Sequence, residues 1–205
     1  VQLGSLQNSP MPSLTNALGG TIVGTSFGVA GVYNAVAVVN NGLITATSGG
    51  SMGVTLTAGG PITNSGTIGG GYAGIMVSGG LGTITNQGSV SGGTAGIWLR
   101  AGGLINNSGA IGGNYAVIVD GGAAVIENSG QINGGRLGVG LSGGGFVTNA
   151  AGGTITGSYP VQITGGGAYL YNRGAIIAAA GASGTAVSMA PGFTDVVSIY
   201  PGSTI

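Results

Sequence analysis

A short unit built around an asparagine recurs along the chain at nearly constant spacing. Three clear copies are Ile62-Thr-Asn-Ser-Gly-Thr-Ile68, Ile84-Thr-Asn-Gln-Gly-Ser-Val90 and Ile105-Asn-Asn-Ser-Gly-Ala-Ile111. Successive asparagines of the series are separated by 24, 24, 22, 21, 21, 21 and 23 residues. A period of this length is typical of a solenoid, because one repeat cannot bury its apolar side alone and needs its neighbours stacked against it. The eight members are Asn16, Asn40, Asn64, Asn86, Asn107, Asn128, Asn149 and Asn172.

The segments between these asparagines have the character of short strands. They are rich in Ile, Val and Thr, they alternate apolar and polar residues, and glycine pairs bound them. We therefore predict an all-β parallel β-helix of about eight coils, with 21–24 residues in each coil, over residues 14–205. Residues 1–13 precede the repeat and are expected to form an N-terminal linker or cap. Three inward stacks are expected: Ala73, Ile75, Val77 and their equivalents; Ile62, Ile84, Ile105, Ile126, Val147 and Leu170; and Ile68, Val90, Ile111, Ile132 and Ile155.

Composition excludes several classes of function. The chain has 50 glycines, 42% hydrophobic residues, zero net charge and no histidine or cysteine. A neutral chain lacks the basic surface that nucleic acid requires. A zinc site is not expected without cysteine or histidine. The sequence contains no apolar run long enough for a transmembrane helix, and its first residues do not resemble a signal peptide. We expect a processed chain or a fragment.

The asparagine column has a structural and a functional interpretation. In the structural one, stacked side-chain amides hydrogen-bond along the axis as an Asn ladder, and we favour this one. Asparagine would also tolerate the left-handed conformation of a tight corner, and the glycine that follows would supply a positive φ. The alternative is a row of amides that binds a ligand.

The six charged residues do not form an obvious catalytic or metal site, so no catalytic residue, cofactor or metal is predicted. Arg100 and Asp120 fall at almost the same position of neighbouring coils, and we expect a surface ion pair between them. Strict alternation would turn Asp120 inward, so its strand is expected to end just before it. The remaining charges are Glu127, Arg136, Arg173 and Asp195.

A stripe of outward apolar side chains is the candidate interaction surface. Met76, Trp98 and Val119 are expected to occupy the same outward position of three successive coils, with Tyr72 and Tyr115 beside them. Such an apolar patch can mark a binding surface. The alternative is that another segment of the protein covers it.

The repeated Ile-Thr-Asn-Ser-Gly-Thr-Ile unit resembles the repeats of autotransporter passenger domains, the adhesin-like type V secreted proteins of Gram-negative bacteria. Residues 62–176 carry the resemblance. It implies a right-handed parallel β-helix, export through the outer membrane and display on the cell surface. Membrane attachment would then come only through a C-terminal barrel that this sequence lacks.

We therefore expect a non-enzymatic, extracellular structural and adhesive module. Its partner would be a protein or glycan ligand, or copies of itself. The alternatives are a self-assembling fibre or layer subunit, a glycan-active β-helix enzyme, and an ice-binding solenoid. The last would need a regular threonine array, and Asn106, Glu127 and Tyr171 interrupt the column of Thr63, Thr85 and Thr148.

Overall fold

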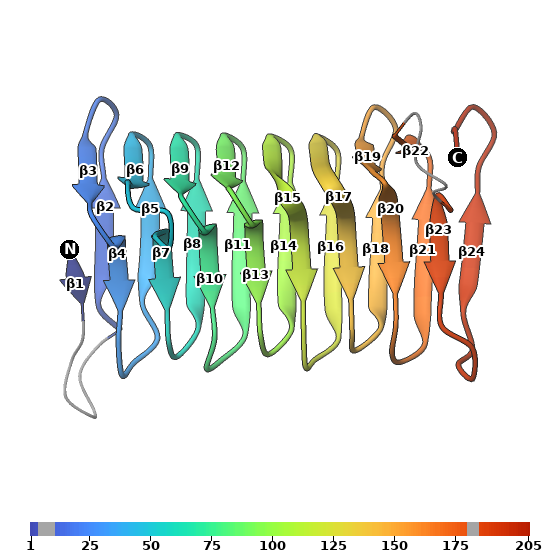
Figure 1. The fold of residues 1–205 in the computed structure, drawn as a ribbon, viewed down its shortest axis with the longest axis horizontal. Coiled ribbons are helices and arrows are strands. Elements are labelled where there is room, and N and C mark those ends of the chain that lie inside the picture. Colours follow the sequence, from blue (N-terminus) through green and yellow to red (C-terminus); the bar gives the residue numbers. More distant parts are fainter. Residues whose placement is uncertain (4–10, 180–184) are drawn as a thin grey trace.

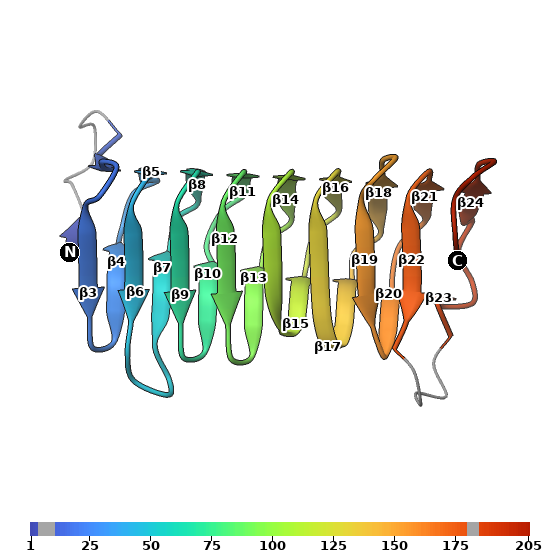
Figure 2. The same ribbon diagram turned by 90° about the horizontal axis from the view of Figure 1, so that it is seen from above.

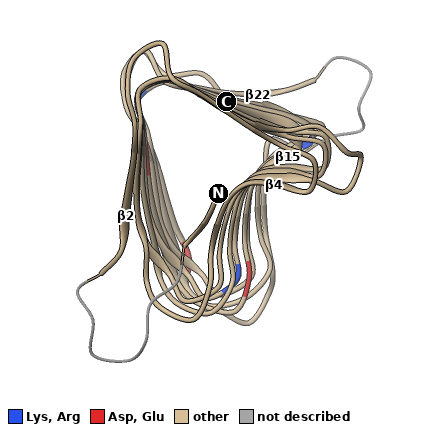
Figure 3. Cartoon of the chain, turned by 90° about the vertical axis from the view of Figure 1, so that its left-hand side faces the viewer, with Lys and Arg blue, Asp and Glu red and all other residues tan. Residues whose placement is uncertain are grey.

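The protein is a rod of stacked coils in the computed structural model, which describes residues 1–3, 11–179 and 185–205. In these ranges the chain forms strands and turns but no helix, and every strand pairing is parallel (Figure 1). No helix that could span a membrane occurs in the described ranges. The predicted parallel β-solenoid of about eight coils is confirmed. Seen from its N-terminal end, the chain runs clockwise as it recedes, so the solenoid is right-handed (Figure 3).

Each regular coil contributes three strands. Seen end-on, the rod has a triangular outline (Figure 3). The strands that carry the asparagines form one sheet, which we call the ladder face. Its strands are β2 (Ser13–Asn16), β5 (Ala37–Asn40), β8 (Gly60–Asn64), β11 (Gly82–Asn86), β14 (Gly103–Asn107), β16 (Ala124–Asn128), β18 (Gly145–Asn149), β21 (Ala168–Asn172) and β24 (Val196–Ile199).

The second strand of each coil lies on what we call the middle face, which is turned toward the viewer in Figure 2. It comprises β3 (Thr21–Gly24), β6 (Leu43–Ala46), β9 (Thr67–Gly70), β12 (Ser89–Gly92), the first parts of β15 (Ala110–Val119) and β17 (Gln131–Leu141), β19 (Thr154–Gly157) and β22 (Ala175–Ala178).

The third strand of each coil lies on what we call the aromatic face. It comprises β1 (Gln2–Leu3), β4 (Phe27–Gly31), β7 (Met52–Leu56), β10 (Ala73–Val77), β13 (Ala95–Leu99), the later parts of β15 and β17, β20 (Tyr159–Ile163) and β23 (Val187–Met189). β15 and β17 run through the corner without interruption, so the middle and aromatic faces belong to one continuous sheet.

The interior consists of aliphatic side chains stacked like on like. Ile62, Ile84, Ile105 and Ile126 pair in register along the ladder face, and each is at most 1% exposed. Equivalent buried rows run under the middle face from Ile68 and under the aromatic face from Ile75. The predicted stacks of the ladder and middle faces, and the rows that continue from Ile75 and Val77, are therefore confirmed, because alternation along a strand sends every second side chain to the same side. The row that begins at Ala73 was expected to continue inward to Leu137, and this is wrong, because the Leu137 side chain lies over Gly140 on the outer side.

The N-terminal segment is only partly described. Gln2 and Leu3 pair with Ala30 and Gly31 and add a strand to the aromatic face beside β4. Ser13, the last residue of the expected linker or cap, begins β2. Residues 4–10 of that segment lie outside the described ranges.

The prediction that Val119 points outward is wrong. Val119 pairs with Leu99 and is fully buried, and Ile118 is the residue opposite Trp98. Between the middle and aromatic faces, Ser91 pairs with Gly112 and Ala95 with Tyr115, so the corner of β15 is one residue shorter than that of the preceding coil. Aligning Tyr115 with Tyr72 by residue type therefore shifted the expected register by one.

The inward and outward positions should differ in their contribution to stability. Ile97→Ala removes a fully buried side chain and should lower the free energy of unfolding by about 2–5 kcal/mol. Ile118→Ala makes the same chemical change at a half-buried outward position of the next coil and should cost about 1 kcal/mol. Urea denaturation measures both, and equal losses would contradict the assignment of the two sides.

Candidate functional site

The eight asparagines form a continuous row of hydrogen bonds inside the rod. From Asn16 to Asn149, the side-chain Nδ2 of each asparagine in the row donates to the Oδ1 of the next asparagine at 2.7–2.9 Å. The row ends where Asn172 Nδ2 donates to the Thr204 carbonyl at 2.8 Å. A carboxamide carries both donor and acceptor, so identical side chains satisfy one another at the spacing of paired strands.

Each amide of the row also satisfies backbone carbonyls at the corner. Asn107 Nδ2, for example, donates to Gly109 O in its own coil and to Gln131 O in the next coil, both at 3.2 Å. The asparagines are 0–6% exposed. No amide of the interior row is open to a ligand, and the geometry is that of a structural ladder.

The glycine two residues after six of the eight asparagines is required for a different reason from the one expected. Tyr33 has the only positive φ among the described non-glycine residues, and Gly88 and its equivalents at this corner do not have positive φ either. A Cβ at Gly88 would instead lie 2.0 Å from the Gly66 carbonyl oxygen of the previous coil. Close stacking of the coil backbones, and not a left-handed conformation, excludes a side chain here.

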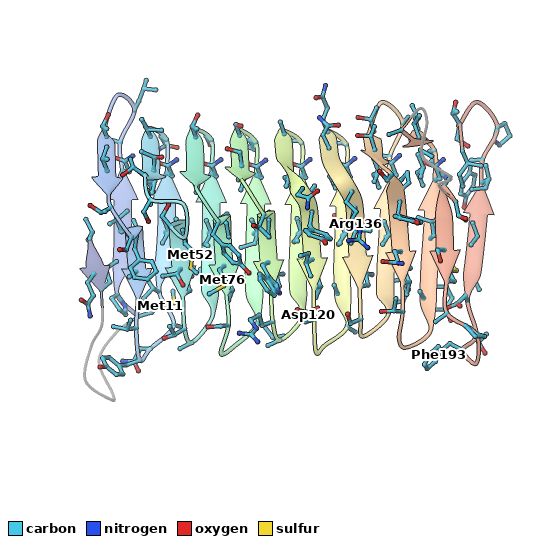
Figure 4. All side chains as sticks on the ribbon, in the orientation of Figure 1. Met11, Met52, Met76, Asp120, Arg136 and Phe193 are labelled. Atoms are coloured by element: carbon cyan, nitrogen blue, oxygen red, sulfur yellow. The ribbon has the colours of Figure 1, made fainter. Side chains whose placement is uncertain are left out.

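Aromatic and charged side chains gather on the outside of the aromatic face. Tyr72 precedes β10, and its ring centroid lies 5.9 Å from that of Trp98. Trp98, half-buried, lies between Met76 and Ile118 in the outward column. Figure 4 labels Met76, Asp120 and Arg136 on this side of the rod. Three of the six charged residues lie here: Arg100, which lies over Trp98, and the labelled Asp120 and Arg136.

The expected ion pair between Arg100 and Asp120 is not formed. β15 ends at Val119, as predicted, and Asp120 lies on the outer side. Its carboxylate accepts from Trp98 Nε1 at 2.7 Å and from Ser142 Oγ at 3.3 Å. Arg100 instead lies over the Trp98 ring, with its guanidinium carbon 5.7 Å from the ring centroid. The indole therefore holds both charges, one at its N–H and one at its face.

The ladder face carries an outward apolar column that was not foreseen. Val125, Phe146, Tyr169 and Val196 occupy equivalent positions and are 36–46% exposed. The sequence signal for this column is the apolar residue that stands directly before the inward aliphatic residue of each of these strands. The Phe146 and Tyr169 rings stack on each other at 4.8 Å and 8°. Their faces are thus directed along the rod, and their edges are directed outward.

A shallow depression of about 310 Å³ lies beside this column on the ladder face. Its lining includes Thr85, Asn106, Glu127 and Thr148, which are successive members of one outward column. Asn106 Oδ1 is buried there without a hydrogen-bond partner. The three acids of the chain are dispersed: Glu127 lines the depression, Asp120 binds Trp98 on another face, and Asp195 Oδ1 accepts from Ala168 N.

The chain matches no protein-family profile, no curated protein and no solved structure. Of the resemblance to autotransporter passengers, only the β-solenoid architecture is supported by the structure.

A buried acid in the ladder should couple stability to pH. Asn107→Asp keeps the acceptor but places a carboxylate beside three acceptor oxygens, on Gly109, Asn128 and Gln131. Burial and these oxygens should raise the pKa of the new carboxyl above its unfolded value of about 3.9. The variant should then lose about 3–5 kcal/mol at pH 7, with the loss shrinking as the pH falls below the folded pKa.

Denaturation of the variant and the native chain between pH 3 and pH 8 measures this dependence. Asn133→Asp, at an exposed position of the middle face, is the matched control and should stay within about 0.5 kcal/mol of the native chain. A loss for Asn107→Asp that does not change with pH would argue against a buried, amide-paired position.

Proposed function

We propose that the protein is an extracellular structural and adhesive module that binds its partner through the aromatic face. The observation that carries this proposal is the gathering of Tyr72, Trp98, Arg100 and Arg136 on one side of a rod that is otherwise poor in charge. Trp, Tyr and Arg are the residues most enriched in the energetic centres of interfaces. The column that holds Trp98 is built on paired strands, so its side chains are already positioned before a partner binds.

The setting we propose is that of an autotransporter passenger on the surface of a Gram-negative cell. The recurring Ile-Thr-Asn-Ser-Gly-Thr-Ile unit and the right-handed solenoid support this setting. The absence of cysteine from the sequence also suits export of an unfolded chain. A stiff rod would hold the aromatic face at a distance from the membrane, where a host surface, another bacterium or a matrix can reach it.

Self-association into a fibre or layer is the second candidate function. The exposed apolar column of Val125, Phe146, Tyr169 and Val196 favours it, because contiguous apolar surface of this kind marks contact sites. A glycan-cleaving role is less favoured, since such enzymes place two carboxyl groups around one bond and the three acids of this chain lie on separate parts of the rod.

Trp98→Ala should separate these functions. Removal of an aromatic anchor costs about 2 kcal/mol or more at an interface centre, which is roughly a thirtyfold loss of affinity. We expect the purified variant to lose that much binding to glycan arrays, matrix proteins or cells, and to keep the sedimentation behaviour of the native chain. Phe146→Ala, on the ladder face, is the control and should keep full binding.

The adhesive function is contradicted if the native chain binds none of these surfaces saturably, or if both variants lose binding equally. A native chain that sediments as an oligomer, with Phe146→Ala monomeric, would favour self-association instead.

A further inference from the structure

A half-enclosed pocket lies on the aromatic face, beyond the Trp98 cluster toward the C-terminus. Its volume is about 230 Å³, and it is lined by Tyr115, Arg136, Leu137, Tyr159 and Gln162. Tyr115, Leu137 and Tyr159 occupy paired positions of β15, β17 and β20, so the pocket spans three successive coils.

The pocket exists because one outward side chain is missing from the column. Ile118, Gly140 and Gln162 are the equivalent outward residues of the three coils. Gly140 leaves a gap between its two neighbours, and the Leu137 side chain folds over it. A Cβ at Gly140 would lie 2.5 Å from Leu137 Cδ2, so the leucine forms an apolar floor where the other coils have an outward side chain.

An irregular corner brings Arg136 to this gap. Gly113 pairs with Gly134 and Tyr115 with Leu137, so Gly135 and Arg136 of β17 lie opposite the single residue Asn114 of β15. Bulges of this kind redirect side chains and are frequent beside functional sites. Here the extra residue is an exposed arginine, placed next to the short corner that positions Tyr115.

The arginine lacks a carboxylate partner. Its guanidinium carbon lies 6.0 Å from the Tyr115 ring centroid, and its Nη1 donates to the Tyr115 hydroxyl at 3.4 Å, a long bond. The closest acid in the register, Asp120, is occupied by Trp98 and Ser142. Within the described ranges no acid pairs with Arg136. A guanidinium held by an aromatic ring with most of its donors unused is suited to bind a carboxylate through two parallel hydrogen bonds.

The rest of the lining suits a ring that carries hydroxyl groups. The Tyr159 hydroxyl and the Gln162 amide have no hydrogen-bond partner in the described part of the chain. They offer donors and acceptors next to the apolar Leu137 floor and the tyrosine rings. The volume lies below the range of about 300–1,000 Å³ that drug-sized ligands occupy, so one ring fits and an oligosaccharide does not.

We propose that this pocket binds a single carboxylated sugar residue, with the carboxylate on Arg136 and the ring hydroxyls on Tyr159 and Gln162. The proposal rests on the adhesive function above and narrows its ligand to an acidic glycan. An acidic protein side chain would satisfy Arg136 but would leave the Tyr159 and Gln162 groups unpaired, so the sugar is the better complement.

Calorimetric titration of the purified native chain with trigalacturonate and with 3′-sialyllactose tests the proposal and distinguishes a uronate from a sialate. Saturable binding of either sugar supports it. Methyl-esterified trigalacturonate and the methyl ester of 3′-sialyllactose keep the ring hydroxyls but neutralise the carboxylate, and they should bind at least tenfold more weakly than their acidic counterparts. Arg136→Met should weaken binding of the acidic sugar at least tenfold, and Tyr159→Leu should weaken it at least threefold.

Arg173→Met is the matched control, because it removes the same charge from an arginine that lies over the Tyr200 ring, 4.4 Å from its centroid, away from the pocket. It should bind as the native chain does. The proposal is overturned if neither acidic sugar binds saturably, if the neutral sugars bind equally well, if both arginine variants lose binding equally, or if a tetraglutamate peptide binds as tightly as the sugar. If the native chain binds no acidic sugar but still adheres in a Trp98-dependent way, the proposed ligand is wrong and the adhesive function remains supported.

Discussion

The rod depends on a row of buried carboxamides that must find their partners in the neighbouring coils. A buried amide left without partners costs about 1–3 kcal/mol, and here each interior asparagine is paired with the asparagine before it and the asparagine after it. A slip of one residue in a coil would send its aliphatic side chains outward and withdraw its amide from the row. The ladder and the aliphatic stacks therefore specify the same register, and the absence of a side chain at Gly88 and its equivalents lets the coils approach closely enough for both.

This interior leaves the outward positions free to differ from coil to coil. The backbone of the ladder face is nearly constant, yet its outward column passes from Thr83 through Val125 to Phe146 and Tyr169. On the aromatic face the outward column changes from Trp98 to Ile118 to Gly140, and that last change opens the pocket. Repeat architectures thus separate stability from recognition. Stability comes from the contact of each coil with its neighbours, and recognition uses side chains that those contacts do not need.

The sequence was sufficient for the architecture and insufficient for the details of the corners. Asparagine spacing and strand alternation predicted the coils and the inward stacks apart from Leu137, because both patterns are local and repeat many times. The outward column was misassigned at Val119, since a one-residue change in the corner before Tyr115 cannot be recognised from residue types alone. The pairing of Asp120 with Trp98 instead of Arg100, and the pocket over Gly140, depend on how three coils align, which no single repeat reveals.

Hydrogen exchange of the asparagine side-chain amides, followed by NMR, shows whether these side chains are buried and paired along the whole rod. We expect the Nδ2 hydrogens of the interior ladder to exchange at least a hundredfold more slowly than those of the exposed Asn133; the interior members are Asn40, Asn64, Asn86, Asn107 and Asn128. Exchange of the ladder amides at the rate of Asn133 would contradict this pairing, because those amides would then be hydrogen-bonded to water and could not set the register of the coils.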